Sequence, residues 1–168
     1  MTIAVGPTVV VADERTDDDS PDVIVDLARW ERLAMATLRD DGATGELTLT
    51  FIGSDDITEL NVQHMGKDGP TDVLSFPMDD DPMPGVPSLL GDVVISPAVA
   101  AAQCADHAGT LDDELALLVV HGILHVRGHD HAEPDEAAAM RRRELELLER
   151  HHWSGPAPSG FRQVHDDE

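Results

Sequence analysis

Residues 121–131 read HGILHVRGHDH, and the spacing of the histidines in this stretch decides what the surrounding chain must form. His121 and His125 lie four positions apart, so on a helix their side chains share one face and can hold one metal ion. Gly128 permits the sharp turn that ends a helix, which lets His131 return toward the same point from the following loop. The stretch therefore predicts a helix that ends near Gly128 and a metal site made by His121, His125 and His131.

Zinc is the metal that this pattern favours, because neutral histidine is a ligand of intermediate softness that suits zinc. Three protein ligands leave a fourth position open for water or substrate, which favours catalysis over a purely structural site. His129 is an alternative to His131, but it follows Gly128 directly and has little chain with which to return. We interpret His129 as a residue that supports a ligand or contacts substrate. The other histidines, at positions 64, 107, 151, 152 and 165, are expected at the surface.

The same spacing occurs in the metzincin proteases, whose motif places a general-base glutamate directly after the first histidine. This chain has Gly122 at that position. Without the carboxylate, peptide hydrolysis lacks the group that removes a proton from the metal-activated water. A metallopeptidase-like hydrolase is therefore the least favoured function.

On the carboxyl side of the motif, Pro134 is typical of the first residue of a helix, and Asp135 and Glu136 favour its amino end. The sequence SGPAPSGFRQVHDDE, which follows Trp153, has no hydrophobic periodicity. We predict one domain over residues 1–152 and a disordered tail over residues 153–168.

On the amino side, Thr110 and Asp113 resemble a capping box that starts the histidine-bearing helix. Earlier segments alternate between strand-like and helix-like patterns of unequal length, which predicts an α+β or mixed α/β layer rather than a barrel or solenoid. The expected strands are residues 8–12, 46–52, 72–78 and 92–96, and the expected helices start at Ser20–Pro21, Ser54 and Pro97.

Composition limits the class of protein. The chain has 168 residues with 41% hydrophobic content, which fits one domain with a core. The single cysteine, Cys104, cannot form an intrachain disulfide, and no apolar run approaches about 18 residues, so we expect a cytoplasmic protein without a membrane segment. The net charge of −23 repels polyanions, so a site for nucleic acid must be local or assisted by a basic partner.

Three further segments, taken with the histidine motif, carry a family resemblance. Leu60 and Asn61 precede PTDVLSFP at residues 70–77, and LGDVVIS follows at residues 90–96. In content, order and spacing the chain resembles the YbeY family of bacterial metal-dependent endoribonucleases and ribosomal RNA maturation factors. The resemblance covers residues 46–150.

The resemblance implies an α+β fold in which a small mixed sheet and several helices surround a cleft that contains one zinc ion. It implies that His121, His125 and His131 are the ligands and that the PTDVLSFP segment lines the cleft, with Thr71, Asp72 and Ser75 as candidates. The family often has tyrosine at the position of His129, which supports leaving it out of the ligand set. Asp130 is a candidate for orienting a ligand through its second ring nitrogen.

One departure from the family concerns the cation beside the cleft. Many members carry an arginine two residues before Lys67, where this chain has Met65, and a thioether cannot stabilise the charge that develops in phosphodiester cleavage. Lys67 is one candidate for this catalytic role, or else a solvated loop residue. Arg127 is another, or else a surface residue near a helix end.

The resemblance further implies a zinc-dependent endoribonuclease that acts on single-stranded RNA in 16S ribosomal RNA maturation and ribosome quality control. The partners that it implies are ribosomal RNA or the ribosomal subunit, together with ribosomal proteins or an assembly GTPase. The alternative is a ribosome-assembly binding factor in which zinc is structural, and the acidic composition favours this alternative.

Overall fold

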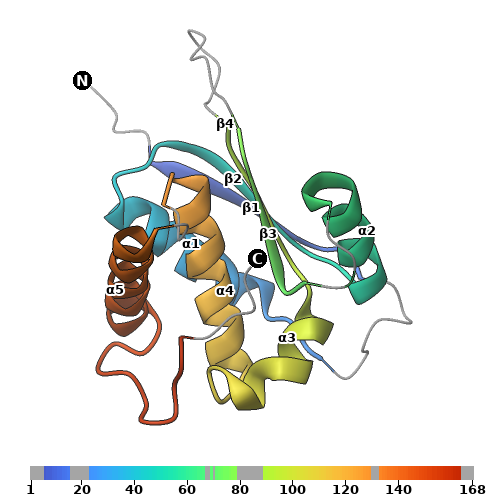
Figure 1. The fold of residues 1–168 in the computed structure, drawn as a ribbon. Helices are drawn as coiled ribbons and strands as arrows, with labels where there is room; N and C mark the ends of the chain where they lie inside the picture. The colour runs from blue at the N-terminus through green and yellow to red at the C-terminus, as the bar shows by residue number, and fades with distance from the viewer. Residues whose placement is uncertain are drawn as a thin grey trace, which may run out of the picture.

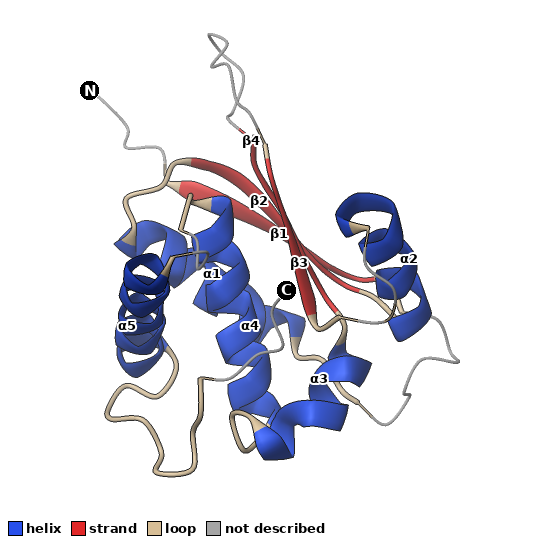
Figure 2. Ribbon diagram, in the orientation of Figure 1, coloured by secondary structure: helices blue, strands red, loops and turns tan. Residues whose placement is uncertain are grey.

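The computed structural model describes residues 6–15, 23–66, 69, 71–78, 89–129 and 133–163, and these form one mixed sheet with helices on both faces (Figures 1 and 2). The strand order is β1-β2-β4-β3. The pairs β1–β2 and β2–β4 are parallel, whereas β3 runs antiparallel to β4 at the edge. The strands are β1 (Pro7–Asp13), β2 (Gly45–Phe51), β3 (Val73–Pro77) and β4 (Leu89–Ile95).

The alternation of side chains along the strands decides which helices pack on which face. Leu47, Leu49 and Phe51 of β2 belong to the main core, with helices α1, α4 and α5. Val94 of β4 faces the other way and packs in a smaller cluster with Ile57 of α2. The helices are α1 (Leu27–Asp40), α2 (Ser54–Met65), α3 (Pro97–Gln103), α4 (Leu111–Val126) and α5 (Pro134–His151), and a short 3-10 turn (Cys104–Asp106) follows α3.

Helix α4 is the centre of the molecule. It lies against β3 and β4 on one side and against α1 and α5 on the other. Its residues from Glu114 to Leu124 are buried, which explains why the sequence is apolar around nearly the whole helix. The described residues thus form a small α+β domain with a four-stranded mixed sheet and five α-helices, which confirms the α+β class and the small mixed sheet but not the predicted zinc-containing cleft. None of these helices is long and apolar enough to cross a membrane within the part of the chain described.

Helix α1 begins later than the sequence predicts. Ser20 and Pro21, the expected start, lie outside the described residues, and residues 23–26 are not helical. The side chain of Asp26 caps the helix by accepting from the backbone N–H of Arg29, and Arg15 donates from Nη1 to the carbonyl oxygen of Val23 at 2.8 Å. Because a partner outside the helix takes the Val23 carbonyl, the segment before Asp26 is held in a non-helical course.

Two other predicted boundaries also differ. Ser54, expected as the cap of α2, is its first helical residue, and Gly53 precedes it in extended conformation, which is a shift of one residue. Strand β4 begins at Leu89 instead of Asp92, because its amino end pairs with Glu46 and Leu47 of β2 across a bulge.

The segment after α5 also differs from the prediction of a disordered tail from residue 153. Residues 153–163 have a defined course, and the ring of Trp153 packs edge to face on Phe161 with centroids 4.8 Å apart. Both rings lie against the main core, and Trp153 Nε1 donates to Asp113 of α4 at 3.0 Å. The domain boundary predicted at residue 152 is therefore not the end of the folded region, which reaches at least residue 163.

Asp40, at the end of α1, joins this helix to α5. Its carboxylate accepts from His151 Nε2 at 2.8 Å, from Arg150 Nη1 at 2.6 Å and from Arg143 Nη2 at 3.2 Å. The hydrogen bond with His151, followed by those with Arg150 and Arg143, holds the pKa of Asp40 well below its usual range. A single carboxylate therefore gathers three side chains from one face of α5.

Candidate metal centre

Helix α4 places His121 and His125 on one face near its carboxyl end, as their spacing predicts. Their ring centroids are 4.5 Å apart and the ring planes are inclined by 79°. His121 is almost fully buried at 2% exposure, whereas His125 is partly exposed. One imidazole therefore stands inside the protein and the next stands closer to solvent.

The turn after α4 has the form that the glycine predicts. Gly128 has a φ of 98°, and its N–H donates to the carbonyl of His125 at 3.0 Å. The N–H of His129 donates to the carbonyl of Leu124 at 2.9 Å. These two bonds form a Schellman motif, which satisfies the last carbonyls of the helix and reverses the chain. The predicted ligand His131 and the predicted supporting residue Asp130 lie outside the described residues, and His129 is partly buried.

Glu144 of α5 is a site residue that the sequence pattern does not reveal. It is 1% exposed, and its Oε2 lies 2.6 Å from Nδ1 of His121. A buried carboxylate at this distance accepts a hydrogen bond from Nδ1–H of the imidazole, which leaves Nε2 as the nitrogen for a metal. Glu144 is 23 residues after His121 on another helix, so no spacing rule connects the two. The only signal in the sequence is a glutamate on the apolar face of α5, between Met140 and Leu147.

The donor set fits zinc as far as it is described. Two imidazoles on one helix face, one of them oriented by a carboxylate, match the ligand type and the supporting contact that zinc sites use. Among the described residues, no group of three or more His, Cys, Asp and Glu side chains is arranged to hold a metal. The assignment of the third ligand to His131 therefore stays a prediction.

Gly122 explains why the glutamate of the metzincin motif is absent. The residue lies on the side of α4 that meets the sheet, where an added Cβ would stand 2.5 Å from Cγ1 of Val93 and 3.3 Å from Oγ of Ser75. A longer side chain at this position would meet strand β4 rather than the space beside the histidines. The close approach of helix and sheet thus excludes a general base at position 122.

The described residues of the PTDVLSFP segment contact α3 and α4. Ser75 Oγ donates to the carbonyl of Gly122 at 3.1 Å, so Ser75 joins β3 to α4. Asp72 is 3% exposed, and its Oδ2 accepts from Nε2 of Gln103 at 2.7 Å. Asp72 is therefore buried against α3, and its place in the lining of a cleft stays a prediction. Thr71 is partly exposed, and its role in a cleft stays a prediction.

Asp72 belongs to a buried polar cluster beside the amino end of α4. Gln103 Nε2 also donates to Oε2 of Glu114 at 3.0 Å, and Glu114, which is fully buried, accepts from the N–H of Ala108 at 3.2 Å. His107 Nδ1 lies 3.4 Å from the same carboxylate. This cluster fixes the start of β3 to α3 and α4. His107 is thus buried, contrary to the expectation that it lies at the surface.

Of the two candidate cations, Lys67 and Arg127, only Arg127 is among the described residues. Lys67 lies outside the described residues. Arg127 is described, and its Nε donates to Oδ2 of Asp41 at 2.7 Å, so its charge is already paired with the end of α1. Met65 ends α2 with 48% of its surface exposed. No described contact links Met65 to the histidines.

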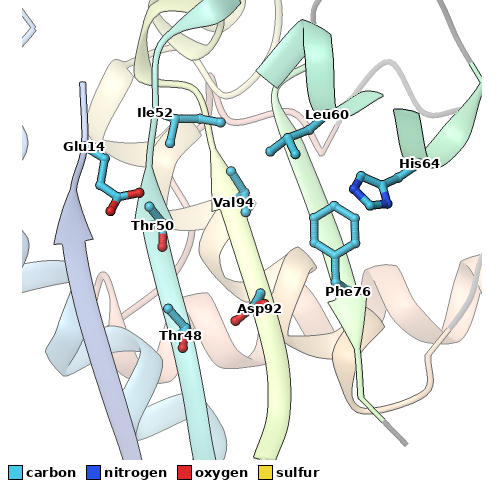
Figure 3. A pocket seen from close by; sticks show the side chains of 9 residues that line it. All are labelled: Glu14, Thr48, Thr50, Ile52, Leu60, His64, Phe76, Asp92 and Val94. Carbon is cyan, nitrogen blue, oxygen red and sulfur yellow. The ribbon is translucent and has the colours of Figure 1, made fainter. Parts of the chain in front are cut away.

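A hollow of about 500 Å³ lies on the opposite face of the sheet, beside α2 (Figure 3). The side chains of Asp92 and Val94 point into it, whereas Val93 between them points toward Gly122 on the other face. The sheet therefore separates this hollow from the histidines. Its described lining contains two carboxylates and no lysine or arginine, which disfavours a phosphate group there. The lining residues are Glu14, Thr48, Thr50, Ile52, Leu60, His64, Phe76, Asp92 and Val94.

Comparison with other proteins gives one consistent result. A family model described as Endoribonuclease YbeY matches residues 14–152. A protein named Endoribonuclease YbeY from Mycolicibacterium vanbaalenii is 43% identical over 150 residues, which cover 84% of this chain and 79% of that protein. A protein of the same name from Mycobacterium tuberculosis is 38% identical over 169 residues, which cover 96% of this chain and 92% of that protein.

The fold is also similar to a solved structure. The solution structure of TM1509 from Thermotoga maritima matches with a TM-score of 0.54 and 22% sequence identity, and the match covers 88% of this chain and 92% of that chain. At this level of identity the match supports the α+β fold.

Proposed function

Because this chain belongs to the endoribonuclease YbeY family, we propose that it is an endoribonuclease whose active centre is one zinc ion bound by His121, His125 and His131. The observation that supports the zinc centre most directly is the buried 2.6 Å contact between Glu144 and Nδ1 of His121, beside the ring of His125. A zinc ion in such a site acts as a Lewis acid on water or on a phosphate oxygen.

The chain's own residues have distinct parts in this proposal. Glu144 fixes the tautomer and the orientation of His121. Lys67 and Arg127 are the candidate cations for the phosphate group of the substrate, and Arg127 must exchange its bond with Asp41 for one with phosphate. His129 and Asp130 follow Gly128 directly in the sequence and are candidates for contacts with the ligands or the substrate.

The substrate in this proposal is single-stranded ribosomal RNA, cleaved in the cytoplasm during 16S maturation and ribosome quality control. A net charge of −23 repels free RNA, so the protein needs a local cationic site or a basic partner that supplies an attractive field. Ribosomal proteins or an assembly GTPase on the ribosomal subunit are the partners that fit this requirement.

The test compares the wild-type protein with His125→Ala, His131→Ala and the control His64→Ala, whose histidine is exposed at the end of α2. His125→Ala is preferable to His121→Ala, because loss of His121 removes a donor from a buried carboxylate and endangers folding. Zinc content is measured by mass spectrometry and cleavage is measured on a single-stranded ribosomal RNA fragment.

We expect one zinc ion per chain and RNA cleavage in the wild type and in His64→Ala, and loss of both in the two ligand variants. Equal cleavage by all four proteins would exclude the proposed active centre. Zinc bound by the wild type without any cleavage, even with ribosomal subunits as substrate, would favour the alternative function, a ribosome-assembly binding factor with structural zinc. The acidic composition is the observation that keeps this alternative in view.

A further inference from the structure

The segment that follows α5 folds back along the helices and ends beside the candidate metal centre. Trp153 donates from Nε1 to Asp113 of α4, and its ring packs on Phe161, which lies against the main core. Ala157 donates from its N–H to Oε2 of Glu149 at 3.2 Å. These contacts fix a segment that lies beyond residue 152, where the family match ends.

Gln163 brings this segment to the carboxylate that orients His121. Its Nε2 donates to Oε1 of Glu144 at 3.1 Å and to the carbonyl of Arg141 at 2.8 Å. The other oxygen of the same carboxylate, Oε2, lies 2.6 Å from Nδ1 of His121. Glu144 therefore bridges Gln163 and His121, and each of its oxygens has a different donor.

This arrangement constrains the carboxylate more than the bond to His121 does. One hydrogen bond leaves a carboxylate able to rotate about its terminal torsion, whereas donors on both oxygens fix its plane. The amide of Gln163 is itself fixed by the carbonyl of Arg141, which precedes Glu144 on α5 by almost one helical turn. The partly buried position of Gln163 limits the exchange of this bond with water.

We propose that Gln163 is a positioning residue that holds Glu144 against His121, so that the segment 153–163 contributes to the affinity of the site for zinc. The part of this inference that concerns zinc rests on the proposed function. The part that concerns Glu144 and His121 does not, because both contacts are made by the protein alone.

The experiment is a double-mutant cycle of Gln163→Leu and Glu144→Gln, with Arg162→Ala as a control at an exposed neighbouring position. Leucine keeps the size of the side chain and removes the donor. Two quantities are measured: the resonance and solvent exchange of the His121 Nδ1 proton by NMR of the metal-free protein, and the zinc dissociation constant by competition with a chelator.

We expect Gln163→Leu to move the His121 proton resonance upfield and to raise the zinc dissociation constant by about three- to tenfold. In the Glu144→Gln background the same substitution should have no further effect, and Arg162→Ala should match the wild type. A purely structural role for the segment would give equal effects in both backgrounds, which would overturn the inference. An unchanged resonance and an unchanged zinc affinity in Gln163→Leu would overturn it as well.

The outcome also separates the two proposals. If the wild type binds no zinc while the His121 resonance still responds to Gln163→Leu and not to Arg162→Ala, the proposed zinc centre fails and the positioning role of Gln163 stands. If the wild type binds zinc with an affinity that is independent of Gln163, the zinc centre stands and the positioning role fails.

Discussion

Gly122 lies on the side of α4 that meets the sheet, and the close contact there, rather than a need for backbone flexibility, explains why this residue is glycine. The nearest atoms to its missing Cβ are the methyl groups of Val93 and the hydroxyl of Ser75. Val93 is β-branched and fully buried, so its methyl groups cannot swing aside at small cost. A side chain at this position must therefore push α4 away from β4.

We predict that Gly122→Ala lowers the free energy of unfolding by about 1–3 kcal/mol in urea denaturation, because overpacking outweighs the gain of about 1 kcal/mol in helix propensity. The variant Val93→Ala supplies the control, since it removes the methyl groups that the new Cβ meets. Gly122→Ala should cost less in that background. Stability equal to or above the wild type for Gly122→Ala alone would contradict the close contact.

Sequence spacing could reveal only those site residues that lie within one helical turn or one loop of each other in the chain. His121 and His125 satisfy this condition, and so does Gly128, whose positive φ forms the predicted turn. Glu144 and Gln163 do not, because they reach His121 from separate segments that only the packing of α4 against α5 brings together. Side-chain convergence across helices has no periodic signature in a sequence.

Among the contacts between secondary-structure elements, those of Asp40 connect helix α1 to helix α5. Three donors from α5 converge on its carboxylate, and the bond with His151 is the first cause of its lowered pKa. A carboxyl group whose pKa is lower in the folded state stabilises that state when the pH is above its unfolded pKa of about 4. This stabilisation is lost as the pH falls through that value toward the lower folded pKa.

We predict that Asp40→Asn lowers the free energy of unfolding at pH 7 by about 1 kcal/mol, since the pairs are partly exposed and screened by solvent. The difference from the wild type should narrow as the pH falls below about 4. Urea unfolding at a series of pH values measures this, with Asp106→Asn at an exposed position as the control. A difference that stays constant or widens in acid would show that Asp40 is not the group responsible.

The limits of α1 and of the final segment show why element boundaries were harder to predict than the elements. Ser20 and Pro21 form a good local start signal, but Arg15 occupies the carbonyl of Val23 and the helix is capped by Asp26. Residues 153–163 have no periodicity because they form no regular element, yet the rings of Trp153 and Phe161 anchor them to the core. In both cases a tertiary contact outweighs the local pattern.

The net charge of −23 belongs to the molecule as a whole, and it determines the long-range electrostatic interaction with any polyanion. Proteins that bind nucleic acid through a basic surface lose affinity as salt rises, because binding releases counterions. An acidic chain that binds RNA through a small local site should instead gain affinity as salt rises, because salt screens the repulsion between the two molecules.

We predict that the KM for cleavage of a short single-stranded RNA falls when KCl is raised from about 50 to about 200 mM. Steady-state kinetics at fixed zinc and pH measure this. A basic single-strand nuclease assayed in parallel should show the opposite trend. A steep rise of KM with salt for this protein would indicate a basic surface that the overall charge conceals.

Strand β4 is in contact with helix α4 on one face of the sheet and with the hollow on the other. Val93 presses on the helix of the histidines, while its neighbours Asp92 and Val94 line the hollow on the opposite face. Occupants of the two faces would be separated by the thickness of the sheet and would not compete for space. Because Val93 contacts α4 and its two neighbours line the hollow, a displacement of α4 would be passed to the hollow through this strand, so a spectroscopic label in the hollow should respond to a displacement of that helix.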